Sequence, residues 1–235
     1  MPAIKTDIHE YTVPNIPHLD VRNNAGAVTF TPGADAQVIV RVTKRARGGI
    51  FRAVSESDLD KVIVTIAQEG DRIIVDTERA SRSFLKNVQI DLDITTPASS
   101  NVALQLNAGN ALMRGLRGQL SIRVNAGAFD ARGVTCVGEG RFEVNAGHLE
   151  FAGAVERGAS LDVQVNAGTA RLRLPQETPL TLDAKTTAGS LEVTGWQVER
   201  SREIARQTAY GPLGAEPAGT LRIRVNAGTV SVTAE

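Results

Sequence analysis

The chain has 235 residues, and its 26 basic and 26 acidic side chains give a formal net charge of zero at neutral pH. This balance argues against a strongly basic nucleic-acid-binding protein. Aromatic residues make up only 4% of the chain, and Cys136 is the single cysteine. The composition therefore excludes an internal disulfide and a cysteine-based zinc site, and it leaves few aromatic faces for stacking on bases or sugar rings.

The N-terminal segment lacks the features of a secretory signal. Residues 1–10 contain no apolar core and no cleavage site of small residues. No stretch of the chain approaches the roughly 18 apolar residues that a membrane-spanning helix needs. From these observations we expect a cytoplasmic protein with no transmembrane segment.

The first predicted strands, within residues 15–97, are irregularly spaced. Apolar and polar residues alternate over 38–42, 62–66 and 88–94, which is the period of a strand with one buried face. Residues 46–61 predict a loop with a short helical turn that begins at Ser55. No linker rich in proline or serine separates this part from the rest, so we expect a single repetitive all-β domain over residues 1–235.

Residues 98–235 repeat a turn of sequence Asn-Ala-Gly. From Gly109 to Gly189 the turn glycines are 18, 20, 21 and 21 residues apart, and apolar residues alternate on both sides of each turn. Each unit therefore predicts strand, turn and strand. The glycine suits a backbone with positive φ, and the asparagine can bond to its counterparts in neighbouring units. The structural turn residues are Asn107, Gly109, Asn125, Gly127, Asn145, Gly147, Asn166, Gly168, Gly189, Asn226 and Gly228.

Two architectures fit units of about 20 residues. In a repetitive β-solenoid each unit is one coil and equivalent residues stack, whereas in an antiparallel β-meander each Asn-Ala-Gly is a hairpin loop. Outward charges favour the solenoid, because stacking places Arg123 beside Glu143 and Glu150 beside Arg171. If the units stack in chain order, Arg171 also faces Glu192.

Two pairs depart from this alternation of charge. Stacking in chain order brings Asp162 against Asp183, and Asp130 against Glu150. Like charges directly opposite one another on neighbouring strands are destabilising, so these pairs argue against a fully regular ladder.

Residues 196–220 form an insertion in the repeat. Within it, residues 200–207 predict a short helix and residues 211–214 a loop. An insertion of this kind can carry specificity, although a tolerated surface loop is the simpler interpretation. The last unit, residues 221–233, is followed by only two residues, so we expect an open strand edge there and head-to-tail self-association.

The candidate reactive residues lie on one predicted outward row. Asp130 and Glu150 occupy equivalent positions in adjacent units, with Arg171 next and His148 nearby. Because a retaining glycosidase uses two neighbouring carboxyl groups, one hypothesis is a hydrolase or lyase that acts on polysaccharides. A solvated charge row is the simpler interpretation, since a flat, aromatic-poor surface lacks a sugar cleft. Cys136 has no fixed histidine partner and predicts an inert side chain, and no motif predicts a metal or cofactor site.

Several blocks of the chain resemble one bacterial family. Residues 37–43, residues 62–75 with their Glu-Gly-Asp turn, and the strand 88–94 that closes in Thr-Thr-Pro-Ala-Ser resemble the bacterial putative-adhesin family of β-strand-repeat domains. The serial units that end in Ala-Gly are also similar, although Asn-Ala-Gly here replaces the commoner Ser-Gly-Asp turn. The resemblance covers roughly residues 15–235. It implies a β-solenoid-like fold and an adhesive or envelope-associated role, and it supplies no catalytic residues.

These observations lead to three functional hypotheses. The first is a non-catalytic binding or structural module whose partner is a protein or a cell-envelope glycan, with no nucleic acid. The second is the polysaccharide-acting enzyme, and the third is a self-assembling scaffold. The resemblance implies association with the cell surface, whereas the N-terminal residues favour the cytoplasm.

Overall fold

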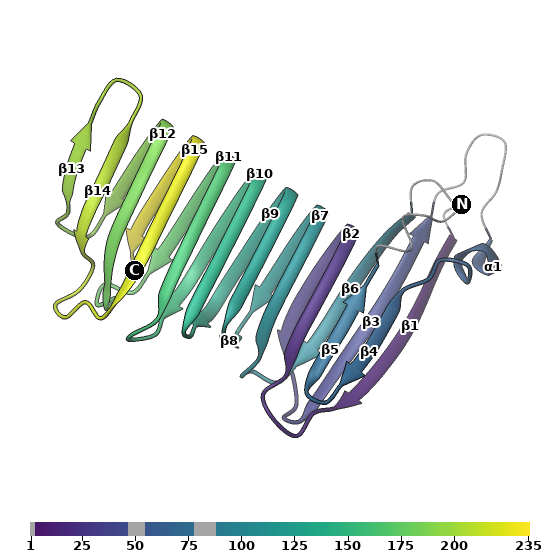
Figure 1. The fold of residues 1–235 in the computed structure, drawn as a ribbon. Coiled ribbons are helices and arrows are strands. Elements are labelled where there is room, and N and C mark those ends of the chain that lie inside the picture. The colour runs from purple at the N-terminus through teal and green to yellow at the C-terminus, as the bar shows by residue number, and fades with distance from the viewer. Residues whose placement is uncertain (1–2, 47–54, 78–87) are drawn as a thin grey trace.

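The structure, a computed structural model, describes residues 3–46, 55–77 and 88–235. They form an all-β fold with one short helix (Figure 1). The N-terminal elements are β1 (Ala3–Thr12), β2 (His18–Pro32), β3 (Gln37–Ala46), α1 (Glu56–Leu59), β4 (Thr65–Glu69), β5 (Arg72–Asp76) and β6 (Val88–Thr96). The remaining strands are β7 (Asn101–Arg114), β8 (Arg117–Gly118), β9 (Leu120–Cys136), β10 (Glu139–Val155), β11 (Ser160–Leu174), β12 (Leu180–Thr194), β13 (Glu199–Arg202), β14 (Gln207–Pro212) and β15 (Gly219–Ala234).

All the strands belong to one mixed sheet that is not closed. Strands β6, β2, β7, β9, β10, β11, β15 and β12 are parallel neighbours in that order. Antiparallel strands lie at both ends: β1 and β3 follow β6 at one end, and β14 and β13 follow β12 at the other. The hairpin of β4 and β5 lies beside β2.

Each long strand turns back on itself at its Asn-Ala-Gly, as β10 shows most directly. The ring centroids of Phe142 and Phe151 are 5.4 Å apart, although nine residues of straight strand would span about 30 Å. The two halves of β10 therefore face each other across the core. The burial pattern agrees, because Val144 and Leu149 are buried whereas Ala146, at the turn between them, is exposed.

The fold thus has two layers, and they separate at β2. The first half of β2 pairs with β5 and its second half with β6, while β7 accompanies both halves. One layer therefore continues into the β4–β5 hairpin, and the other continues into β6, β3 and β1. At the opposite end, the first half of β12 pairs with β14, so the β13–β14 hairpin extends the first layer.

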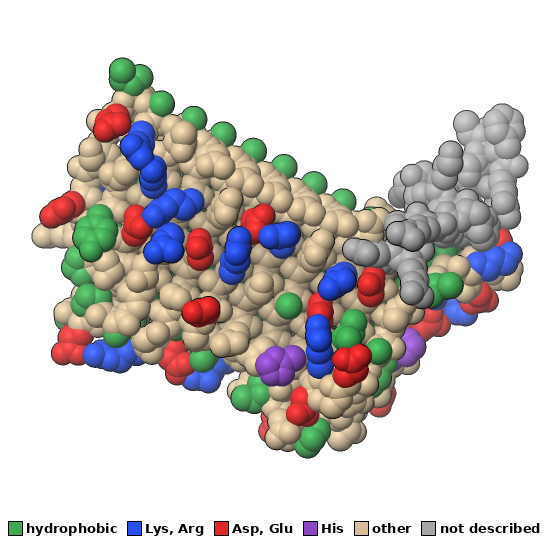
Figure 2. Space-filling view, in the orientation of Figure 1, with side chains coloured by type: hydrophobic (Ala, Val, Ile, Leu, Met, Phe, Trp, Pro, Cys, Tyr) green, Lys and Arg blue, Asp and Glu red, His purple; other side chains and the backbone are tan. Residues whose placement is uncertain are grey.

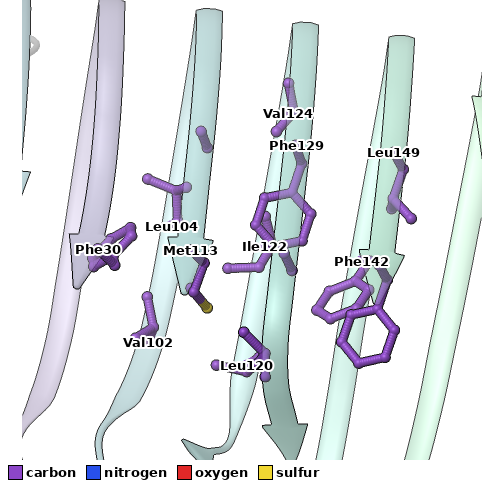
Figure 3. Close-up of a cluster of buried hydrophobic side chains, with 14 of the residues drawn as sticks. Phe30, Val102, Leu104, Met113, Leu120, Ile122, Val124, Phe129, Phe142 and Leu149 are labelled. Atoms are coloured by element: carbon purple, nitrogen blue, oxygen red, sulfur yellow. The ribbon is translucent and has the colours of Figure 1, made fainter. Parts of the chain in front are cut away.

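The core lies between the two layers and consists mainly of aliphatic side chains. Its largest members are the fully buried Phe30, Phe129, Phe142 and Phe151. Phe129 of β9 packs against Phe142 of β10 with ring centroids 5.4 Å apart, and Figure 3 shows such side chains aligned on neighbouring strands. Burying one large apolar side chain contributes roughly 1.5–3 kcal/mol, so the stacked rows are the main source of stability.

The turn glycines form a column in which backbone stacks directly on backbone. Their φ angles on β7, β9, β10, β11 and β15 lie between 133° and 143°, a region that residues with a Cβ rarely adopt. A Cβ on any of them would lie 1.7–1.9 Å from the carbonyl oxygen of the glycine on the preceding strand of the stack. The positive φ predicted from the sequence is confirmed, and the close approach adds a second reason for glycine.

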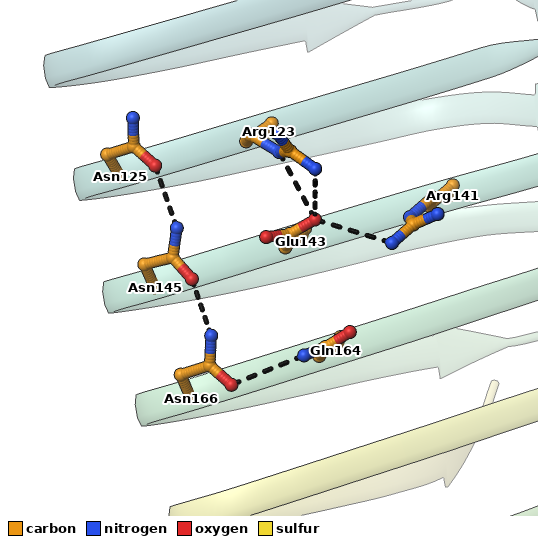
Figure 4. A network of polar contacts seen from close by, with 7 residues as sticks. All are labelled: Arg123, Asn125, Arg141, Glu143, Asn145, Gln164 and Asn166. Atoms are coloured by element: carbon orange, nitrogen blue, oxygen red, sulfur yellow. Dashed lines mark hydrogen bonds and ion pairs between the residues drawn. The ribbon is translucent and has the colours of Figure 1, made fainter.

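The turn asparagines form a ladder of hydrogen bonds beside the glycine column (Figure 4). In each step, Nδ2 of one asparagine donates to Oδ1 of the asparagine on the preceding strand, over 2.5–3.1 Å. The ladder connects Asn24, Asn107, Asn125, Asn145, Asn166 and Asn226. The expected bonding between counterparts in neighbouring units is therefore confirmed.

The antiparallel meander is wrong for the strands that carry these turns. Strands β7, β9, β10 and β11 pair in parallel, and Ala126, Ala146 and Ala167 lie opposite one another. A hairpin at each turn would instead pair the two halves of one unit antiparallel within a layer. The glycine geometry turns the chain from one layer to the other, so the two halves cannot pair.

The stack departs from chain order at its C-terminal end. β15 lies between β11 and β12 and pairs in parallel with both, so the expectation that Arg171 faces Glu192 is wrong. Arg222 lies between Asp162 and Asp183 instead, and its Nε is 3.8 Å from the Asp183 carboxylate. The repulsion that chain order implied between the two aspartates is therefore absent.

The insertion at 196–220 closes the end of the stack. The helix predicted over 200–207 is wrong, because β13 and β14 form an antiparallel hairpin there. Side chains of this hairpin bond to the backbone of the second half of β12: Gln207 accepts from the Leu191 amide, and Arg200 donates to the Val193 carbonyl. The open edge predicted at the last unit is also wrong, since β15 is an internal strand. The helical turn predicted from Ser55 is confirmed as α1.

The glycine column yields a stability prediction. Gly147→Ala should lower the free energy of unfolding by about 3 kcal/mol, because the new Cβ combines backbone strain with a backbone clash. Gly133→Ala is the matched control, since φ there is 61° and no atom lies within 4 Å of an added Cβ; its cost should be about 1 kcal/mol. Chemical denaturation measures both, and equal costs would contradict the stacking of backbone on backbone.

Candidate functional site

A groove crosses the first halves of β2, β7 and β9 on the outer surface of the fold. It consists of a hollow of about 630 Å³ and a second one of about 250 Å³. The two hollows share Asp20, Ala103 and Ser121, so they form one continuous depression. We call this depression the β2–β9 groove.

The groove exists because a row of small side chains lies between rows of longer ones. Asp20, Ala103 and Ser121 are opposite one another on neighbouring strands and form the floor. The rows on either side supply the walls: His18, Asn101 and Gln119 on one side, and Arg22, Gln105 and Arg123 on the other. Strand register therefore fixes where the groove lies on the scaffold.

Ion pairs hold several of the charged side chains around the groove. Asp20 accepts a hydrogen bond of 2.6 Å from Arg72 of β5. Glu143 accepts from Arg123 at 2.8 Å and lies 3.5 Å from Arg141 (Figure 4). Exposed ion pairs of this kind contribute at most about 1 kcal/mol each, so their main effect here is to orient the side chains.

The end of the groove near the starts of the strands is acidic. Asp20, Glu69, Asp71 and Glu139 line the larger hollow. Asp71 accepts from the side-chain amide of Asn15 at 2.8 Å. Glu69 and Glu139 form no ion pair with any residue that the structure describes, so their charges are available to a ligand. Figure 2 shows acidic and basic side chains interspersed over the surface in view.

The predicted reactive row lies on the other layer, in the second halves of the strands. Asp130, Glu150 and Arg171 are opposite one another on β9, β10 and β11, as expected from the repeat. The Asp130 carboxylate is bound by both Nε and a terminal nitrogen of Arg132, at 3.0 and 2.7 Å. Glu150 pairs with Arg173, so each carboxylate of the row has its own arginine.

His148 belongs to the same network. Its Nδ1 shares a hydrogen bond of 2.5 Å with the Thr169 hydroxyl, and its Nε2 lies 3.8 Å from the Glu150 carboxylate. The row therefore brings together all four predicted residues on one layer, but Asp130, His148, Glu150 and Arg171 line neither hollow of the β2–β9 groove.

Cys136 is fully buried at the end of β9. Burial raises the pKa of its thiol to about 11, because the thiolate loses hydration in an apolar surrounding. A Cβ on Gly140 would lie 2.3 Å from its Sγ, so the thiol fills space beside this glycine. The geometry suits a packing residue better than a nucleophile.

The described residues offer neither a metal site nor a membrane-spanning helix. In the described ranges 3–46, 55–77 and 88–235, no group of His, Cys, Asp or Glu is placed to hold a metal ion. Within the same ranges, no helix has the length and apolar character needed to span a bilayer.

Sequence reasoning missed the groove. Its floor depends on the pairing of Asp20 with Ala103, two residues 83 positions apart in the chain, and a repeat pattern does not specify that pairing. The available signal was the small size of Ala103 and Ser121, which occupy equivalent outward positions in adjacent units.

The thiol of Cys136 gives a direct test of this burial. At pH 8, a thiol-reactive dye should label Cys136 in the folded protein on the order of 100-fold more slowly than in the unfolded chain. The reason is that the pKa of the buried thiol lies about three units above this pH, so little of the reactive thiolate forms. Ser121→Cys is the control, since Ser121 is exposed, and its added thiol should react at an ordinary rate. Labelling of Cys136 as fast as that of the control would contradict the burial.

Comparison with known proteins supports the fold. No family model matches the chain, and no curated protein matches its sequence. A putative cell adhesion protein from Clostridium sporogenes aligns over 99% of this chain and 100% of its own, with 11% identity and a TM-score of 0.59. A putative adhesin from Bacteroides fragilis aligns over 97% of both chains, with 10% identity and a TM-score of only 0.39. The chain thus shares its fold with the Clostridium protein, in agreement with its resemblance to the bacterial putative-adhesin family.

Proposed function

We propose that this chain is a β-solenoid that works as a non-catalytic binding module, with the β2–β9 groove as its binding site. The solenoid interpretation is supported by the turn glycines. They are 18–21 residues apart in the sequence from β7 to β11, yet they lie opposite one another in parallel strands. Each unit of about 20 residues then corresponds to one coil.

The observation that carries the binding role is the groove itself. It is a continuous depression across parallel strands, with a floor of small side chains and walls of charged and amide groups. Concave sites with a few convergent polar groups are where proteins usually hold ligands. A depression that crosses several strands suits an extended ligand better than a compact one.

The chemistry of the lining favours a peptide over a sugar polymer. Among the described residues that line the groove, none is Phe, Tyr or Trp, and these are the side chains on which sugar rings usually stack. At the acidic end, Glu69 and Glu139 supply charges that no described residue pairs with. We therefore assign the ligand as an extended peptide segment with basic residues, carried by a partner protein.

The non-catalytic role is supported by the pairing of the carboxylates. Asp130 and Glu150 each have an arginine partner, and neither lines the groove. A role at the cell envelope is supported by the shared fold with a putative cell adhesion protein. The same fold can host many functions. The non-catalytic role and the role at the cell envelope are therefore proposals about this chain in particular.

A groove-filling variant tests the binding role. Peptides selected from a displayed library on the wild-type protein should be extended and basic, and Ser121→Trp should weaken their binding at least about 10-fold by filling the floor. Ser231→Trp is the matched control, because Ser231 lies between buried Val230 and Val232 on β15 and points outward on the other layer. It should bind like the wild type.

Two results would contradict different parts of the proposal, namely the location of the site and the class of ligand. Equal binding by Ser121→Trp and the wild type would exclude the groove as the site. Binding of purified envelope glycans in place of peptides, with loss in Ser121→Trp, would keep the site and reject the peptide.

A further inference from the structure

β1 is the outermost strand at the N-terminal end of the sheet (Figure 1). One of its edges is fully bonded to β3, from Ala3 opposite Ala46 to Thr12 opposite Gln37. Its other edge pairs with no strand in the part of the chain that the structure describes. Only every second residue of β1 directs its backbone N–H and C=O groups away from β3 toward this edge, and these groups make the edge a template for another strand.

The other strand edges are protected, which makes β1 distinctive. β13 at the opposite end has only four residues, and all are exposed and mostly charged. The edge of the second half of β12 is covered by side-chain bonds from Gln207 and Arg200. β4 has five residues. Short, charged or covered edges are the usual protection against pairing.

β1 also exposes two large apolar side chains on one face. Ile4 and Ile8 are 49% and 54% exposed, and Thr6 between them is exposed as well. Lys5 and Asp7 alternate with them and are half-buried. Lys5 forms an ion pair with Asp60, and the Asp7 carboxylate lies 3.2 Å from Nζ of Lys44. From Ile4 to Ile8 the side chains are therefore apolar, basic, neutral, acidic and apolar, in that order.

This order is self-complementary in an antiparallel pair centred on Thr6. Ile4 then lies opposite the partner's Ile8, Lys5 opposite the partner's Asp7, and Thr6 opposite the partner's Thr6. Apolar and opposite-charge cross-strand pairs each contribute roughly 0.2–1 kcal/mol. The two isoleucine pairs bury exposed apolar surface, and the Lys5 and Asp7 pairs extend an ion-pair network that already exists in one copy.

Neighbouring registers do not fit. A shift of the centre to Lys5 or to Asp7 places two like charges directly opposite each other, which is destabilising. If the centre of pairing lies between two residues, one copy must be turned over, and the apolar face of one strand then lies beside the charged face of the other. One register therefore stands out from the alternatives.

We propose that two copies of this chain associate through β1, paired antiparallel about Thr6. The interface is isologous, because a twofold axis relates the same strand of the two copies. The layer that contains β6, β3 and β1 then continues from one copy into the other. This assembly joins N-terminal ends, unlike the head-to-tail association expected from the sequence.

A register-specific cross-link tests the proposal. Thr6→Cys should form a disulfide-linked dimer under mild oxidation, because residue 6 is its own partner and cross-strand Cβ atoms are close enough for a disulfide. Thr12→Cys, on the same exposed strand, is the control and should link at least about 10-fold more slowly. Cys136 is buried and does not compete.

Sedimentation of the unmodified protein gives the second readout. The wild type should form a dimer whose dissociation constant rises at least about 10-fold in Ile8→Lys. Ile204→Lys, at an exposed position in the β13–β14 hairpin, should leave it unchanged. A strict monomer up to about 100 μM, or equal cross-linking of Thr6→Cys and Thr12→Cys, would overturn the proposal.

Discussion

The stacking of backbone on backbone at the Asn-Ala-Gly turns is the constraint on which this structure depends. Each turn glycine lies so close to the next that a Cβ would be 1.7–1.9 Å from a carbonyl oxygen. Such contact is possible only when the turns are aligned strand by strand. The asparagine ladder beside the glycines satisfies the polar side chains of the same turns. Register at the turn then fixes register along both halves of each strand that carries such a turn.

Aligned strands turn a repeat in sequence into rows in space. Inward rows become the stacked core, where Phe129, Phe142 and Phe151 are in contact. Outward rows become either ion-pair networks or, where the side chains are small, the floor of the groove. At the C-terminal end, the Arg224 hydrogen bond holds the pKa of Asp183 below its usual range, which again links neighbouring strands.

The sequence predicted the local features well because they depend on residue type. Alternation located β3, β6 and the strands that carry the Asn-Ala-Gly turns, the glycines located the turns, and Ser55 located the helical turn. The strand expected over 62–66 begins only at Thr65, and β1 was not predicted. The position of β15 between β11 and β12 could not be predicted, because the units share one pattern and that pattern does not specify their stacking order. Residues 200–207 contain good helix formers, but pairing of β13 with β14 outweighs that weak preference. The groove depends on pairing between β2 and β7, which the repeat alone does not specify.

The stacking order of the turns is the most direct test of this account. Ala108, Ala188 and Ala227 are exposed at their turns and can carry spin labels attached to introduced cysteines. Strands are about 4.8 Å apart, so Ala227, four strands from Ala108 in the stack, should lie about 19 Å away and Ala188 about 24 Å away. The account predicts two narrow distance distributions, with Ala227 nearer. Broad distributions, or Ala188 nearer to Ala108 than Ala227 is, would contradict it.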